Sequence, residues 1–286
     1  TAAAIVPLGM AFIGDNVPYR ERQAVLARFL TGTIMGLVGG QVMGGVLGDL
    51  VGWRAVFLLL GGLFLLVGVL LQIEARSPRV PPPVLTGSIR PAALVRGYAL
   101  LFGRAWARVV LATVFVEGFL FYGAFTFVGA YLRHAFGVDY AVVGLLLGCF
   151  GIGGGIYALS VRRLMARLGE HGLALGGGAI LMLGFLVVAF GPLALMAPAI
   201  TALGLGMYML HATLQTNATQ MAPEARGLAV STFANALFLG QAAGVWLAGT
   251  AVDRIGFPPV FAAMGVALMG LGAAFAHRLA RRPGPS

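Results

Sequence analysis

The stretch GLVGGQVMGGVLGDLVGWRAVF, from Gly36 to Phe57, holds seven glycines among its twenty-two residues and lies in an apolar part of the chain. Glycine destabilises a helix by about 1 kcal/mol relative to alanine, so its abundance here needs a reason. Gly36, Gly40 and Gly44 recur at every fourth position, which places them on nearly one helix face. In lipid, small residues at this spacing let two helix backbones approach closely. The pattern predicts a membrane helix that packs tightly against a neighbour.

The composition around this stretch is that of a membrane protein. Of the 286 residues, 59% are hydrophobic and only 10% are charged, whereas soluble domains carry about 25% charged residues. A spanning helix needs about 20 mostly apolar residues, and Gly191-Pro192 is the natural break in the longest apolar run. We predict the end of one helix at residues 1–14 and complete spans at 24–47, 54–73, 109–132, 140–160, 172–191, 194–217, 228–251 and 257–277.

The arginines divide between the two sides of this layout. All 19 basic residues are arginine, and 16 of them lie in alternate loops or at the C-terminus; the other side holds only Arg54, Arg133 and Arg254. Cytoplasmic loops carry such an excess of positive charge. The split predicts a cytoplasmic C-terminus in a bacterial inner membrane, and it argues against nucleic-acid binding because the arginines separate apolar runs.

The longest predicted loop, residues 76–107, is a cytoplasmic linker. Its first part, from Ser77 to Ser88, is proline-rich and is expected to be extended. The following ALVRGYALLFGRAWAR mixes arginines with Tyr98, Phe102 and Trp106. This segment has two interpretations, an amphipathic helix along the membrane interface or a solvated connector.

The opening stretch recurs 204 residues later. Eight identities in one ungapped register pair Arg22, Gly36, Gly40, Gly45, Asp49, Gly52, Val56 and Phe57 with Arg226, Gly240, Gly244, Gly249, Asp253, Gly256, Val260 and Phe261. Both copies enter the membrane from the same side. Parallel repeats related by an axis along the membrane normal are typical of one class of transporters.

With these features the chain resembles the major facilitator superfamily, most closely its twelve-helix drug and metabolite efflux branch. The antiporter motif of the family's fifth helix, Gly-x-x-x-Gly-Pro-x-x-Gly-Gly, is similar to Gly36, Gly40, Gln41, Gly44 and Gly45, with Gln41 in place of proline. That replacement removes the proline that would kink the helix. GDNVPYRER, from Gly14 to Arg22, resembles the preceding loop of the family.

The resemblance implies an all-α membrane fold of two six-helix bundles that here lacks about the first three and a half helices. Residues 1–75 would be the remnant of the N-terminal bundle, with the end of helix 4 and helices 5 and 6. Residues 76–107 would be the linker, and residues 108–286 the C-terminal bundle with a short basic tail.

Glu117 is the sharpest candidate for function, because it is the acidic residue well inside a predicted span. A charge at mid-membrane costs about 2.5–3.5 kcal/mol on insertion scales. One interpretation is a protonatable group that couples transport to protons; the other is a structural hydrogen bond to a neighbouring helix.

Further polar and aromatic residues share faces with one another at helical spacing. Phe121 and Phe125 follow Glu117, Tyr208, His211 and Gln215 lie on one face of a later helix, and Asn235 lies on the next. They are predicted either to line a substrate cavity or to form ordinary interhelical contacts. Asp49 and Asp253 are predicted to be interfacial helix caps.

The sequence contains no hydrolase motif, paired carboxylates or cluster of Cys and His, so no enzyme, cofactor or metal site is predicted. The leading hypothesis is proton-coupled efflux of small organic compounds by a protein that is monomeric at full length. A metabolite importer or symporter on the same fold is the first alternative, and a non-transporting membrane sensor or scaffold is the second.

Overall fold

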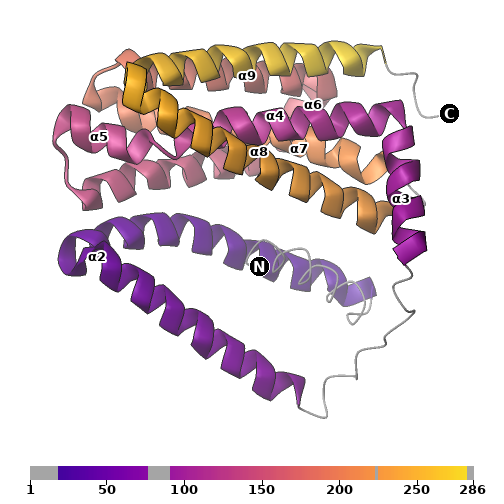
Figure 1. The fold of residues 1–286 in the computed structure, drawn as a ribbon, viewed down its shortest axis with the longest axis horizontal. Coiled ribbons are helices and arrows are strands. Elements are labelled where there is room, and N and C mark those ends of the chain that lie inside the picture. The colour runs from indigo at the N-terminus through magenta and orange to yellow at the C-terminus, as the bar shows by residue number, and fades with distance from the viewer. Residues whose placement is uncertain (1–18, 77–90, 223–224, 282–286) are drawn as a thin grey trace.

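The computed structural model describes residues 19–76, 91–222 and 225–281, and within these ranges every regular element is a helix (Figure 1). In chain order the elements are α2 (Tyr19–Ala75), α3 (Pro91–Gly103), α4 (Ala105–Phe125), α5 (Val128–Phe136), α6 (Tyr140–Phe190), the short 3₁₀ helix η2 (Leu193–Leu195), α7 (Met196–Gln220), α8 (Arg226–Ile255) and α9 (Phe257–Ala280). The all-α fold is confirmed. The helix end expected at 1–14 and the proline-rich part of the linker lie outside the described residues.

Two of these elements are each a pair of helices joined at a glycine. The 51 residues of α6 would extend for about 76 Å at 1.5 Å per residue, far beyond a bilayer core of about 30 Å. Gly169 interrupts α6 with φ 61° and ψ −176°, and Gly52 interrupts α2 with φ 78° and ψ 155°. Only glycine adopts these conformations readily. The predicted divisions between 24–47 and 54–73, and between 140–160 and 172–191, are therefore confirmed.

The internal repeat has a counterpart in the backbone. Gly256, the residue that pairs with Gly52, separates α8 from α9 with φ 80° and ψ 173°. The two glycines thus have nearly the same conformation, and each follows an aspartate, Asp49 or Asp253, by three residues. The same sequence pattern ends a helix and starts the next in both copies.

The span predicted at 109–132 is not one continuous helix. It is divided into α4 and α5 by a turn at Thr126 and Phe127, where the Phe127 N–H bonds to the Ala124 carbonyl. A Cβ on Gly249 of α8 would lie 3.3 Å from the Phe127 ring, so this ring occupies the space that the glycine leaves free. Both turn residues keep right-handed helical dihedral angles, and Ala105–Phe136 forms one membrane-capable span. The predicted span is therefore confirmed, with a local break at Phe127. The predicted break at Gly191-Pro192 is confirmed.

The bundle core lies among α4, α6, α7, α8 and α9. In the strongest pairings α6 packs against α7 and α9, and α4 packs against α8. Phe121, Phe185, Phe261 and Phe275 are the largest fully buried side chains. Because lipid tails are as apolar as these side chains, packing stabilises such a core in a membrane more than exclusion from water does.

Glycines set the distance between α8 and α4. A Cβ on Gly240 would overlap the carbonyl oxygen of Phe115, and one on Gly244 would overlap that of Phe119. From the other side of the same contact, a Cβ on Gly118 of α4 would overlap the carbonyl oxygen of Leu237 in α8. A carbonyl beside a glycine Cα is the geometry of weak Cα–H···O contacts, which contribute about 0.5–1 kcal/mol each. The glycines of the second repeat copy therefore form the close helix contact that their spacing predicts.

The second half of α2 has a different environment. Every residue from Phe57 to Ile73 is exposed in this structure. A helix that is apolar on all sides needs lipid or other helices around it. Six helices of the described chain are long and apolar enough to cross a membrane, with α2 and α6 each counted once. The chain is an integral, multi-pass membrane protein.

The turns between helices gather at two ends of the molecule. The bend of α2, helix α5 and the junction of α8 with α9 lie at one end, whereas α3 and the last turn of α9 lie at the other (Figure 1). These are the two sides between which the arginines divide in the sequence. Which of them faces the cytoplasm remains a prediction from the positive-inside rule.

Candidate functional site

Glu117 lies in the middle of α4 with a fully buried side chain (0% exposed). The next residue, Gly118, is in close contact with the backbone of α8, so α4 and α8 touch beside this position. A carboxyl group in such a place needs a polar partner.

The partner of Glu117 is His211 of α7. The Glu117 Oε2 atom lies 2.8 Å from His211 Nδ1, and the histidine side chain is 21% exposed. The Phe233 ring of α8 lies against the imidazole with 5.5 Å between ring centres. The other carboxyl oxygen, Oε1, is buried and has no hydrogen-bond partner in the part of the chain that the structure describes. The pair therefore joins α4 to α7 and leaves one acceptor unsatisfied.

Aromatic rings continue from this pair toward α5 and back to α7. The Phe121 and Phe125 rings stack with centres 5.2 Å apart, and Phe150 of α6 lies 5.0 Å from Phe125 and 6.0 Å from Tyr208. Tyr208 precedes His211 by one helical turn. We call Phe121, Phe125, Phe150 and Tyr208 the aromatic chain. It connects the predicted residues of α4 with those of α7.

The structure does not bring all the predicted cavity residues together. Phe121, Phe125 and Tyr208 belong to the aromatic chain, and Glu117 pairs with His211 about one helical turn away on the same two helices. Gln215 and Asn235 are exposed on α7 and α8 and are not part of the aromatic chain.

Sequence reasoning missed two members of the site, Phe150 and Phe233. Both lie in apolar segments that resemble any other part of a membrane helix. The one local signal for Phe150 is the glycine-rich GIGGG that follows it, from Gly151 to Gly155.

Those glycines bring α6 and α7 together at the aromatic chain. A Cβ on Gly153 would overlap the carbonyl oxygen of Thr201, and one on Gly204 would overlap that of Phe150. A Cβ on Gly154 would lie 2.6 Å from the Tyr208 ring. The segment GIGGG therefore packs tightly against α7 at Gly153 and Gly154, and Tyr208 lies against α6.

The antiporter-type motif lies in the first half of α2, which packs against α6. A Cβ on Gly45 would overlap the carbonyl oxygen of Tyr140 and would lie 2.8 Å from the Cα of Gly144. The close contact predicted for Gly36, Gly40 and Gly44 is not found: within the described chain nothing lies within 4 Å of a Cβ at any of the three.

This difference has a geometric reason. Gly45 is rotated by about 100° from Gly44 around the helix axis, and it is this neighbouring face that meets α6. Gln41, in the position of the family's proline, continues the helix, and its buried side-chain oxygen has no hydrogen-bond partner among the described residues.

Asp49 caps a helix other than its own. Its carboxylate accepts hydrogen bonds from the backbone N–H groups of Tyr140, at 3.0 Å, and Ala141, the first residues of α6. Asp139, the N-cap residue of α6, makes no capping bond with its side chain. A negative charge stabilises the N-terminus of a helix and destabilises the C-terminus. Asp49 therefore stabilises the start of α6 and not the end of the helix on which it lies. The prediction of a cap is thus confirmed for Asp49, with α6 as the helix that it caps.

We expect Asp49→Ala to lower the free energy of unfolding by about 0.5–2 kcal/mol, the usual cost of losing an N-cap. The repeat provides a matched control, because Asp253 is exposed and the structure gives it no capping bond. Unfolding in detergent should therefore shift for Asp49→Ala and change little for Asp253→Ala. Equal shifts for the two variants would contradict the assignment of Asp49 as the cap of α6.

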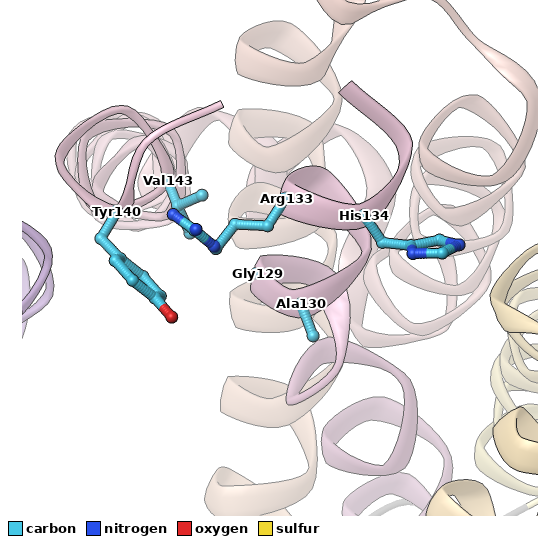
Figure 2. Close-up of a pocket in the computed structure, with 6 residues that line it drawn as sticks. All are labelled: Gly129, Ala130, Arg133, His134, Tyr140 and Val143. Atoms are coloured by element: carbon cyan, nitrogen blue, oxygen red, sulfur yellow. The ribbon is translucent and has the colours of Figure 1, made fainter. Parts of the chain in front are cut away.

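A cavity of about 600 Å³ lies between α5 and the start of α6, lined by Gly129, Ala130, Arg133, His134, Tyr140 and Val143. Figure 2 shows Arg133 reaching toward Tyr140 while His134 points away from them. The guanidinium lies 3.6 Å from the centre of the Tyr140 ring and donates a hydrogen bond to the Val138 carbonyl at 3.3 Å. None of the predicted substrate-path residues lines this cavity.

A polar contact at the opposite end lies beside the Gly169 turn. Asn217 is buried (1% exposed) and donates hydrogen bonds to the Glu170 carboxylate and to the Thr213 carbonyl, both at 2.9 Å. The contact links the end of α7 to the turn inside α6. Among residues 19–76, 91–222 and 225–281, no three His, Cys, Asp or Glu side chains lie close enough to hold a metal ion.

Comparison with known proteins gives consistent results. The family model described as Major Facilitator Superfamily matches residues 1–226 and 130–286. The chain is 25% identical over 258 residues to the uncharacterized MFS-type transporter YfhI of Bacillus subtilis, covering 88% of this chain and 62% of the relative. It is 26% identical over 274 residues to the uncharacterized MFS-type transporter YwfA of the same organism, covering 94% and 63%.

A third relative is a probable transporter of Streptomyces coelicolor, which is 28% identical over an alignment of 290 residues. The alignment covers 94% of this chain and 62% of the relative. The chain therefore spans less than two thirds of the length of the curated relatives that it matches.

Proposed function

The chain belongs to the major facilitator superfamily, and on this premise we propose that the protein is a secondary active transporter that exports small organic compounds in exchange for protons. Two six-helix halves would alternate between outward-facing and inward-facing states around a central site. The observation that supports proton coupling best is the buried pair of Glu117 and His211.

The pair can hold a variable number of protons. With one proton between them, His211 donates from Nδ1 to the Glu117 carboxylate, and the pair carries one negative charge. A second proton makes the pair neutral overall, either as an imidazolium beside a carboxylate or as two neutral groups. A neutral pair suits the buried position of Glu117, whereas a net charge favours a state in which water or a cation reaches it. Protonation would therefore bias the two transport states differently.

The aromatic chain suggests where an organic substrate would bind. We assign Phe125 and Tyr208 to the wall of the substrate path, with Phe121 behind them and Gln215 and Asn235 as exposed polar groups. A cationic compound near these rings would be attracted by their π-faces and by the negative charge of the singly protonated pair. Proton and cation would then compete for the same charge, which is the requirement for exchange.

The direction of transport is supported by the antiporter-type motif. Gly36, Gly40, Gly44 and Gly45 match four of its five defined positions, and Gln41 departs from the fifth. Symport of a metabolite on the same fold is the alternative, and the site chemistry is compatible with both. We further propose a monomer in the inner membrane of a bacterium, with the C-terminus in the cytoplasm, from the distribution of arginines.

Proteoliposomes with a pH-sensitive dye in the lumen test this proposal. Tetraphenylphosphonium, as an organic cation, and neutral and anionic dyes of similar size would be added outside. Exchange predicts that entry of the cation drives protons out, so the lumen becomes alkaline. Acidification would establish symport and overturn efflux by exchange, and substrate flux without a pH change would overturn coupling. The absence of flux for every compound would favour the sensor or scaffold.

A further inference from the structure

Helix α3 crosses the end of the bundle instead of following its direction (Figure 1). It precedes α4 directly, and the corner between the two is held by arginines. Arg108 donates hydrogen bonds to the carbonyls of Phe102 and Gly103 at 2.7 and 3.1 Å, and Arg104 donates to the Met221 carbonyl at the end of α7 at 3.1 Å. Because the spanning helices run along the membrane normal, a helix fixed across their end lies in the plane of the membrane surface.

One face of α3 is attached to the bundle. Leu101 is buried (1% exposed), and a Cβ on Gly97 would lie 2.8 Å from the Leu228 side chain of α8. These residues are four positions apart and so lie on the same side of the helix. The position and orientation of α3 are therefore set by the described chain.

The opposite face is apolar and exposed. Val95, Tyr98 and Phe102 follow one another at spacings of three and four residues, and their side chains are 68%, 38% and 49% exposed. The rings of Tyr98 and Phe102 stack with centres 6.4 Å apart. Aromatic residues on one face of a helix at the end of membrane spans are characteristic of the interfacial region, where an apolar ring and a polar group are both accommodated.

The segment of chain that contains α3 carries charges of one sign. Residues 75–116 contain no Asp or Glu, whereas Arg76, Arg79, Arg90, Arg96, Arg104 and Arg108 lie in or beside this segment. Arg96 is exposed, next to the apolar face of α3. Basic groups at a membrane surface are attracted to anionic lipids. This charge complements an anionic phospholipid surface and disfavours a basic protein partner.

We propose that α3 is an interfacial anchor whose Val95, Tyr98 and Phe102 enter the boundary between headgroups and acyl chains, with Arg96 on the headgroups of anionic phospholipids. The anchor ties the linker to the membrane surface at the point where it enters the bundle. This function does not depend on the substrate or on proton coupling, so the experiment that tests it is separate from transport assays.

A nitroxide label at Val95→Cys tests the position of this face in the intact protein, with Cys149→Ala to remove the native thiol. In vesicles of phosphatidylcholine and phosphatidylglycerol, the label should collide more with oxygen than with a water-soluble nickel complex. Two controls bracket the result. Leu183→Cys, a residue 57% exposed in the middle of the predicted span 172–191, represents the lipid core. Thr219→Cys, exposed near the end of α7, represents water.

A label at Val95 that is as accessible to nickel as the one at Thr219 would overturn the anchor. A label that neither reagent reaches would also overturn it, because a protein surface would then cover α3. Replacing Arg96→Gln, or omitting phosphatidylglycerol, should move the label toward water. If neither change has an effect, the role of anionic lipid is refuted.

Discussion

Glu117→Gln is expected to reduce pH-gradient-driven transport to the level of protein-free vesicles. Glutamine has nearly the size and shape of the glutamate, and its amide oxygen can still accept a hydrogen bond from the Nδ1–H group of His211, which lies 2.8 Å from the carboxylate oxygen in the native pair. The variant should therefore fold, and it should still exchange substrate across the membrane without a gradient. It cannot take up and release a proton at this position, so the driving force is lost.

The control for this experiment is Glu170→Gln. It changes a carboxylate to an amide in the same chain, at the Gly169 turn, where Glu170 accepts a hydrogen bond from Asn217. Coupled transport should persist in this variant. Unchanged proton-coupled flux in Glu117→Gln would contradict the proposed role, and the pair with His211 would then be a structural contact between α4 and α7.

The second large effect is expected at the contact between α8 and α4. Gly244→Ala places a methyl group where the carbonyl oxygen of Phe119 already lies. Backbone atoms cannot move aside as a flexible side chain can, so the two helices must separate. Overpacking of this kind typically costs about 1–3 kcal/mol. The separation would also disturb the contact of α4 with α8 beside Glu117, so loss of coupling should accompany loss of stability.

Gly270→Ala is the matched control on α9. This glycine is exposed, and nothing lies within 4 Å of an added Cβ. Since alanine favours the helix by up to about 1 kcal/mol, the variant should be as stable as the parent or slightly more stable. Unfolding midpoints in mixed detergent micelles compare the two. If Gly244→Ala has no effect on the midpoint, the close contact of α8 with α4 is not a source of stability.

Local patterns in the sequence predicted the helices well and their partners poorly. The apolar runs and the Gly191-Pro192 break predicted most spans, because hydropathy and backbone restriction are properties of consecutive residues. The local break at Phe127 carried no signal in the sequence, and the Phe127 ring lies beside Gly249, more than a hundred residues later. The glycine contact on α2 was assigned to Gly36, Gly40 and Gly44, whereas Gly45 makes it.

In the candidate site, too, the sequence indicated a single residue well and its packing partners poorly. Glu117 was recognisable by itself, because an acid inside an apolar span is costly and needs a reason. Its pairing with His211 was not, although both residues were candidates, because nothing in the sequence says that α4 and α7 face each other at this height. Phe150 and Phe233 carried no signal at all, since an aromatic residue in a membrane helix is common.

The sequence by itself determined that this chain is an all-helical membrane protein with an internal repeat, and that Gly52 and Asp49 have counterparts at Gly256 and Asp253. These properties follow from composition, spacing and the backbone freedom of glycine, which act over a few turns of helix. Only the tertiary structure decided that Asp49 caps α6 and that Glu117 bonds to His211. Each of these contacts joins residues about ninety positions apart, and the packing of whole helices brings them together.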